Sequence, residues 1–265
     1  MKSDFKALYT SAWAFMLACP LLFLIPVLVE FAQHVVEMQT GMYTGEEGAA
    51  AAADHPLRMQ FGFAKTLALL LPGYWFVRFV MFGNDAVEAR RLAWPAIGLW
   101  LVLAAISAAQ LYWQMFGGSL PQMVGLDGNA AGLASGGLSL FATILGIYFT
   151  CWMIAWPLGN ARIGPIRSFR IMTGSFWYAV ALLLAGVLPL MALHYGLGYA
   201  AILWTPHWLD WIIMAFDSVV TGFLALTMTG SMIFAARHAA DRKGASLLPD
   251  ESEPVIISTP SEEAG

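Results

Sequence analysis

Long runs of apolar residues, separated by short polar segments, dominate this sequence. A membrane-spanning helix needs ~20 mainly apolar residues, because it rises about 1.5 Å per residue across roughly 30 Å of hydrocarbon. The runs lack the alternation of barrel strands, and hydrocarbon offers no water to unpaired backbone groups. The pattern therefore predicts an all-α, polytopic membrane protein with six transmembrane helices. The predicted spans are approximately 12–36, 61–83, 93–115, 134–158, 174–200 and 212–236.

The charged residues fall mostly between these runs and predict an orientation. Of the 265 residues, 59% are hydrophobic and 11% are charged. Lys and Arg gather before the first run, after the sixth, and in the two even-numbered loops, at Lys2, Lys6, Arg90, Arg91, Arg162, Arg167, Arg170, Arg237, Arg242 and Lys243. The alternate loops hold Arg58 alone. Because loops rich in Lys and Arg stay in the cytoplasm, we expect a multi-pass protein of the bacterial inner membrane with both termini cytoplasmic.

The first run, the first loop and the C-terminal segment each support a separate prediction. The first run is much longer than the apolar part of a secretory signal, so we expect a permanent span. We expect the loop over about 38–60 to be the most mobile part of the outer face. Beyond Lys243 the chain is acidic and cannot bury enough apolar surface to become ordered. The sequence thus predicts a six-helix transmembrane domain over 1–243 and a flexible acidic cytoplasmic tail over 244–265.

A basic residue followed by a tryptophan precedes the first, third and fifth runs. The pairs are Lys6 with Trp13, Arg91 with Trp100, and Arg170 with Trp177. A Gly-Asn dipeptide follows the second and fourth runs, at Gly83-Asn84 and Gly159-Asn160. These recurrences predict an internal repeat of three parallel helical hairpins, unlike the inverted repeats common in transporters.

Ionisable residues within the spans are the best candidates for a functional site, because such residues are costly in a bilayer. The predicted orientation gathers five of them in a polar layer near the outer face, at Glu30, His34, Lys65, His194 and Asp217. Lys65 and Asp217 occupy matching positions in the repeat, so we expect them to form a structural ion pair or to bind a lipid headgroup. The alternative for the layer is that these residues only mark where helices leave the bilayer. Near the inner face, Arg78 can extend to lipid phosphates, so it is a candidate for binding lipid headgroups.

The residue types in this layer leave a metal site open. Glu30, His34 and Glu37 lie on one face of a continuous helix, because they are four and three residues apart. With His194 they could offer nitrogen and oxygen ligands to zinc or iron. A haem held by His34 and His194 is a related alternative, but no matching inner pair of histidines serves electron transfer across the membrane.

Motifs that would name a reaction are absent from the sequence. It contains no Gly-x-Ser-x-Gly, His-Glu-x-x-His, Cys-x-x-Cys or Walker pattern, so no catalytic residue is predicted and the cofactor stays unknown. The net charge of −4 does not suggest a nucleic-acid partner. The expected partners are membrane lipids and other membrane protein subunits.

The basic entry residues Lys6, Arg91 and Arg170 before their tryptophans resemble those of poorly characterised six-helix bacterial membrane families. These families include the membrane domain fused to some glycerophosphodiester phosphodiesterases. The resemblance covers 1–243 and implies a helical integral membrane protein without assigned catalytic residues. We expect no appended hydrolase domain, so phosphodiester hydrolysis is not implied.

Three functions follow as expectations. The first is a non-enzymatic accessory or assembly subunit of a larger membrane complex, which fits the lack of catalytic motifs. The second is a transporter or lipid-handling protein that uses the polar layer near the outer face. The third is a metal- or haem-binding membrane enzyme.

Overall fold

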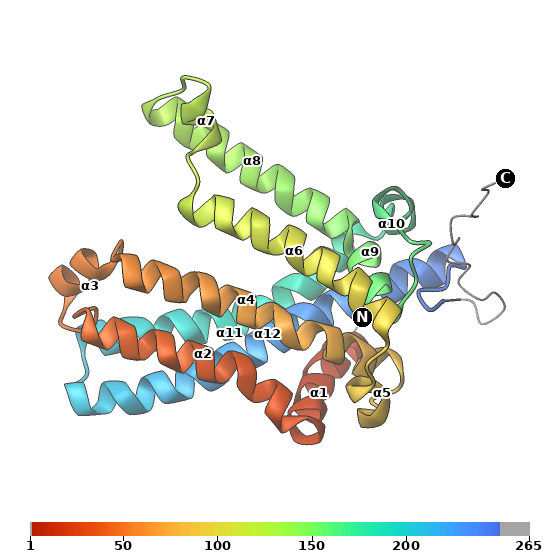
Figure 1. The fold of residues 1–265 in the computed structure, drawn as a ribbon, viewed down its shortest axis with the longest axis horizontal. Helices are drawn as coiled ribbons and strands as arrows, with labels where there is room; N and C mark the ends of the chain where they lie inside the picture. The colour runs from red at the N-terminus through yellow and green to blue at the C-terminus, as the bar shows by residue number, and fades with distance from the viewer. Residues whose placement is uncertain (1, 250–265) are drawn as a thin grey trace, which may run out of the picture.

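The computed structural model describes residues 2–249 as an all-helical bundle, with no strand in that range (Figure 1). The elements are α1 (Lys2–Ala18), α2 (Pro20–Gln39), α3 (Glu46–Ala52), α4 (Pro56–Met81), α5 (Ala86–Arg90), α6 (Trp94–Phe116), α7 (Leu120–Met123), α8 (Gly128–Tyr148), α9 (Thr150–Ala155), the 3₁₀ turn η1 (Trp156–Leu158), α10 (Pro165–Met172), α11 (Phe176–Leu203) and α12 (His207–Lys243). The predicted all-α class is therefore confirmed.

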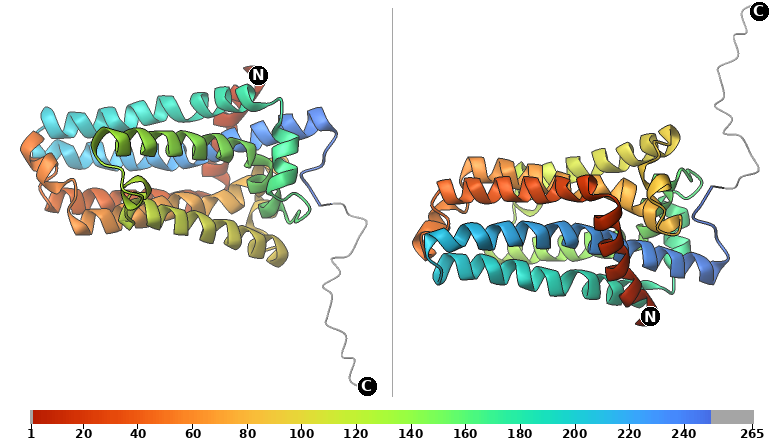
Figure 2. Two further views of the ribbon diagram at one scale, coloured as in Figure 1. Left: turned by 90° about the horizontal axis from the view of Figure 1, so that it is seen from above. Right: turned by 90° about the horizontal axis from the view of Figure 1, so that it is seen from below.

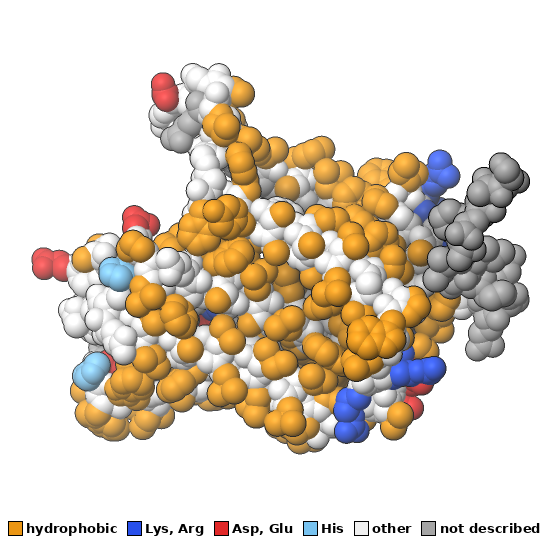
Figure 3. Space-filling model, viewed as in Figure 1, with side chains coloured by type: hydrophobic (Ala, Val, Ile, Leu, Met, Phe, Trp, Pro, Cys, Tyr) orange, Lys and Arg blue, Asp and Glu red, His pale blue; other side chains and the backbone are white. Residues whose placement is uncertain are grey.

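Six helices of the described part, α2, α4, α6, α8, α11 and α12, are long and apolar enough to cross a membrane. These are the lengths and compositions of a multi-pass membrane protein, as predicted. They form three hairpins, α2 with α4, α6 with α8, and α11 with α12 (Figures 1 and 2). Lys and Arg gather at the end of the bundle where α4 and α12 finish, which we call the basic end (Figure 3). The opposite end, where α2 finishes and α12 begins, is called the far end.

Helix α12 is the centre of the bundle, whereas α6 and α8 lie at its edge. In α12, 72% of the most apolar window is buried, against 6% in α8. Small residues let neighbouring helices approach α12 closely, as packing in lipid favours. A Cβ atom added at Gly222 would lie 2.6 Å from Val27 of α2, and one added at Gly186 of α11 would lie 2.2 Å from the Ser231 hydroxyl.

The basic half of the bundle has a dense aromatic core. Phe15 of α1 packs edge-on against Phe76 and Phe79 of α4, with ring centroids 5.2 and 5.4 Å apart. Leu8 and Ile233 are fully buried in the same cluster. These buried side chains join α1, α4 and α12 in one core.

The first predicted span, 12–36, is wrong at its start. The helix breaks at Cys19, and Pro20 begins α2, because proline lacks a backbone donor and is well suited to the first turn of a helix. Helix α1 turns steeply away from α2 (Figure 2) and buries Leu8 and Phe15. The first helix long enough to cross is therefore Pro20–Gln39.

The fourth predicted span, 134–158, begins and ends too late. Helix α8 runs from Gly128 to Tyr148, and the chain then continues as α9 and η1. Ser168 of α10 stabilises the break, because its hydroxyl donates to the Tyr148 carbonyl at 2.8 Å and accepts from the Trp152 amide at 3.0 Å. These hydrogen bonds stabilise the break, and the hydrophobic pattern of the sequence does not reveal them.

The segment after α12 packs on the bundle before the described part ends. The Asn160 side-chain amide donates to the carbonyls of Leu247 and Leu248 at 3.3 and 3.1 Å. Leu247 is buried in the core of the basic half. The first residues of the predicted tail 244–265 are therefore held against the bundle, and residues 250–265 lie outside the described part.

Candidate functional site

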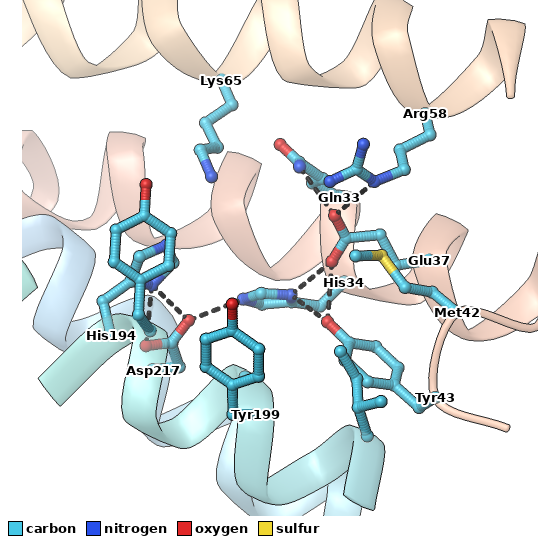
Figure 4. Close-up of a pocket in the computed structure, with 13 residues that line it drawn as sticks. Gln33, His34, Glu37, Met42, Tyr43, Arg58, Lys65, His194, Tyr199 and Asp217 are labelled. Carbon is cyan, nitrogen blue, oxygen red and sulfur yellow. Dashed lines mark hydrogen bonds and ion pairs between the residues drawn. The ribbon is translucent and has the colours of Figure 1, made fainter. Parts of the chain in front are cut away.

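The five residues of the predicted polar layer meet in the far half of the bundle, and Figure 4 shows His34, Lys65, His194 and Asp217 among them. They come from α2, α4, α11 and α12, and we call them the polar cluster: Glu30, His34, Lys65, His194 and Asp217. Glu30 is fully buried, and the exposed fractions of His34 and Asp217 are only 4% and 1%. Charged and titratable groups buried at this depth are costly unless they are paired, so their contacts decide what the site can do.

The polar cluster is a continuous chain of contacts across the four helices. Lys65 Nζ lies 3.0 Å from Glu30 Oε1, and His34 Nε2 lies 3.3 Å from the same oxygen. His34 Nε2 is also 3.0 Å from Asp217 Oδ2. His194 Nδ1 lies 2.7 and 2.9 Å from the two oxygens of Asp217.

The predicted ion pair between Lys65 and Asp217 is wrong. Lys65 of α4 is paired with Glu30, whereas Asp217 of α12 lies between two histidines. Matching positions in a repeat give similar depths along the helices, but they do not give the direction of the side chains. Here α2 presents Glu30 to α4 and His34 to α12, so it separates the two expected partners.

A second group of residues holds His34 from its other side, and we call it the supporting group: Gln33, Glu37, Tyr43 and Arg58. Glu37 Oε2 lies 2.9 Å from His34 Nδ1 and accepts from the Tyr43 hydroxyl at 2.7 Å. Glu37 Oε1 accepts from Gln33 Nε2 at 2.9 Å and from Arg58 Nε at 3.1 Å. The carboxylate of Glu37 is therefore fully engaged by its neighbours.

Tyr43 and Arg58 bring the first loop to this site, and sequence reasoning missed both. The loop predicted to be the most mobile outer segment contains helix α3, and Arg58 also donates to the Ala53 carbonyl at 2.7 Å. Burial, together with the nearby Glu37 carboxylate, raises the pKa of the Tyr43 phenol above its usual value. Tyr43 therefore remains a hydrogen-bond donor. The sequence signal that could have indicated this part of the site was Arg58, the lone basic residue of the outer loops.

The two ring nitrogens of His34 face different carboxylates. Nδ1 faces Glu37, while Nε2 faces both Glu30 and Asp217. An ionised carboxylate only accepts hydrogen bonds, and a neutral imidazole has only one donor. When Nδ1 donates to Glu37, Nε2 of a neutral ring has no proton to donate to Glu30 or Asp217. A second ring proton or a bound cation then satisfies these two carboxylates.

A cavity of about 370 Å³ lies beside these residues (Figure 4). The polar wall includes His34, Lys65 and Asp217, and the α11 wall includes Tyr195 and Tyr199. Both tyrosines are well exposed on α11. The cavity thus joins the buried polar cluster to the surface of α11 and has the size of a site for a small ligand or an ion with its water.

The metal-ligand set differs in part from the predicted one. Glu30, His194 and Asp217 each place a ligand atom within 4.8 Å of the other two. Of the predicted ligands, Glu30 and His194 belong to this set, whereas His34 does not, and neither does Glu37, which pairs with Arg58. Asp217 replaces Glu37 because α12 faces α2 and α11 together. A haem between His34 and His194 does not fit this geometry, since Asp217 contacts both imidazoles and lies between them.

Arg78 is not placed to bind lipid headgroups, contrary to the prediction. Only 3% of its surface is exposed. Its guanidinium donates to the Glu88 carbonyl at 3.1 Å and to the Glu88 carboxylate at 2.9 Å. A side chain so enclosed fixes the turn from α4 to α5, and its role is structural.

The chain was also compared with known proteins. No family model, no curated protein sequence and no solved structure matches it. The resemblance to six-helix bacterial membrane families therefore remains an expectation.

Proposed function

We propose that this protein binds a cationic ligand in the polar cluster, as a transporter or a lipid-handling protein of the bacterial inner membrane. The observation that carries this proposal is the balance of charge at the site. Among its described residues, the carboxylates Glu30, Glu37 and Asp217 face only two permanently charged bases, Lys65 and Arg58.

The excess of negative charge is located at one place. Arg58 is paired with Glu37, and Lys65 is paired with Glu30. Among the described residues, Asp217 contacts only His34 and His194, and neither side chain carries a permanent charge. A buried carboxylate without a permanent positive partner attracts a cation, and the neighbouring cavity gives that cation room.

The arrangement of the helices suggests how the ligand reaches the site. By the excess of Lys and Arg, we assign the basic end to the cytoplasm and the far end to the outer side. The aromatic core of Phe15, Phe76 and Phe79 separates the polar cluster from the basic end. A ligand therefore enters from the outer side or from the outer leaflet, past Tyr195 and Tyr199.

Ligand-dependent thermal unfolding of the full chain in lipid nanodiscs tests this function. The probes are zinc chloride, potassium chloride and nanodiscs containing phosphatidylethanolamine, each compared with a probe-free phosphatidylcholine control. At least one probe should raise the Tm of the wild type and leave a Glu30→Gln, His34→Gln, Asp217→Asn triple variant unchanged. If no probe separates the two proteins, the proposal is wrong.

A second candidate function is that of an accessory or assembly subunit, and the α6 and α8 hairpin favours it. Only 11% and 6% of the most apolar windows of these helices are buried. Gly132 and Gly136 lie one turn apart on α8, and a Cβ atom added at either would meet nothing within 4 Å. Such exposed small residues suit contact with a helix of another membrane subunit.

Mild-detergent purification followed by mass spectrometry tests this second function. A partner subunit should copurify with the wild type and be lost from a Gly132→Leu, Gly136→Leu variant. A wild-type protein that purifies alone would exclude the role.

We also propose that the three hairpins are parallel repeats. A short helix precedes each of them, α1 before α2, α5 before α6 and α10 before α11. The recurring basic residue lies in or directly after each short helix, at Lys6, Arg91 and Arg170. This shared order supports a common unit of one short helix and one hairpin.

A further inference from the structure

We propose that the cation is a divalent transition-metal ion of the zinc, iron or manganese class, held by Glu30, His194 and Asp217. This inference rests on the proposed function and names its ligand. The three residues come from α2, α11 and α12, so a metal ion would join the three helices at the far half of the bundle.

The spacing of the three ligands suits one ion. Their ligand atoms all lie within 4.8 Å of one another. Zinc binds imidazole nitrogen and carboxylate oxygen at about 2.0–2.2 Å, so ligands around one ion are roughly 3–4 Å apart. Binding of one ion therefore requires the three side chains to move slightly closer together.

Glu30 supplies an independent observation. Its Oε1 accepts from Lys65, but its Oε2 is buried and has no hydrogen-bond partner among the described residues. A buried carboxylate oxygen without a partner is costly, because it has lost its water without any replacement. A metal ion beside Oε2 gives this oxygen the missing partner, while Lys65 continues to hold Oε1.

His34 adds a fourth group, already oriented. Its Nδ1 lies 2.9 Å from Glu37 Oε2, the carboxylate–histidine contact that commonly orients metal ligands. That contact directs Nε2 toward Glu30 and Asp217, at 3.3 and 3.0 Å. His34 can therefore bind the ion directly or through a water molecule, with Glu37 fixing its tautomer.

The types of ligand atom decide between classes of cation. Calcium, magnesium and alkali ions prefer oxygen ligands, whereas imidazole together with carboxylate suits zinc, iron and manganese. An ammonium group pairs with carboxylates but gains nothing from a nitrogen lone pair. Because His34 and His194 both face Asp217, the site favours a transition metal.

Zinc titration of the purified full chain, followed by isothermal calorimetry, tests the inference. We expect one zinc ion per chain, and we expect Glu30→Gln, His194→Gln or Asp217→Asn to weaken binding by more than about 100-fold. Asp210→Asn is the matched control, because Asp210 is an equally buried aspartate on α12 that pairs with Thr205 and His207 instead. It should bind zinc like the wild type.

Several outcomes would overturn the inference. These are no zinc binding by the wild type, or equal zinc affinity in the wild type and the Asp217→Asn protein. If one variant does not fold, the zinc affinities of the other two still test the inference. The visible spectrum of the cobalt-loaded wild type is a further test, since four-coordinate ligation by histidine and carboxylate gives cobalt intense d–d bands. If phosphatidylethanolamine or potassium raises the Tm of the wild type but zinc does not bind, the metal is excluded while the proposed function stands.

Discussion

Asp217 of α12 lies between two histidines from different helices, with its Oδ2 atom 3.0 Å from His34 Nε2 and 2.7 Å from His194 Nδ1. This contact connects α2, α11 and α12 in the interior of the bundle, where only 1% of Asp217 is exposed. The relationship gives the residue a structural role as well as its proposed part in binding a cation.

Replacement of Asp217 by alanine should destabilise the protein strongly. The change leaves two buried histidines without their carboxylate, and each buried polar group left without a hydrogen-bond partner costs about 1–3 kcal/mol. Unfolding by denaturant in detergent measures the loss. Asp210→Ala should cost less, because the contacts of Asp210 lie at the start of its own helix. Equal losses would argue against a connecting role for Asp217.

Tyr43→Phe should weaken both the fold and zinc binding, because it removes the hydroxyl that donates to Glu37 at 2.7 Å. The lost hydrogen bond costs about 1 kcal/mol of stability. Loss of an outer-shell contact typically lowers metal affinity by ~10-fold or more. Calorimetry with zinc checks the second effect, and an unchanged affinity would show that the supporting group does not orient His34.

Gly186→Ala should destabilise the contact of α11 with α12. The new methyl group would meet the Ser231 hydroxyl at 2.2 Å and the Thr227 carbonyl at 2.9 Å. Overpacking of this kind costs about 1–3 kcal/mol. Gly196→Ala in the same helix meets nothing within 4 Å and is the matched control. A variant at Gly186 as stable as its control would contradict the described packing.

Cysteine labelling in whole cells should establish the orientation. Both native cysteines, Cys19 and Cys151, are buried and should react slowly. A cysteine at Asp127, in the exposed loop of the far end, should react with an impermeant maleimide from outside. A cysteine at Val87, which is 71% exposed at the basic end, should react only after lysis. The reverse pattern would contradict the assigned topology.

Hydrophobic patterning predicted the long helices well where packing did not interrupt them. The predicted spans 61–83 and 93–115 each fall largely within one helix, Pro56–Met81 and Trp94–Phe116. The first span failed at Pro20, where a proline begins a new helix, and the fourth failed where a distant part of the chain decides the outcome. Ser168 stabilises the end of α8 from 20 residues away, and no local pattern reveals such a contact.

The sequence predicted which residues form the site, but it did not predict which of them pair with one another. Ionisable residues at similar depths must find one another in a bilayer, so depth alone indicated that Glu30, His34 and Asp217 would gather. The partner of Lys65 depends on which face each helix presents, and that is set by packing around α12. Tyr43 reaches the site from a loop, where hydrophobic patterning carries no information.

X-ray absorption spectroscopy at the zinc edge, on the zinc-loaded full chain, tests whether a transition metal binds at Glu30, His194 and Asp217. We predict one zinc ion with nitrogen and oxygen ligands at about 2.0–2.2 Å and the scattering pattern of imidazole. The Asp217→Asn protein should lack this signal under the same conditions. Zinc that is ligated by sulfur, fully hydrated, or bound identically in the Asp217→Asn protein would contradict the account.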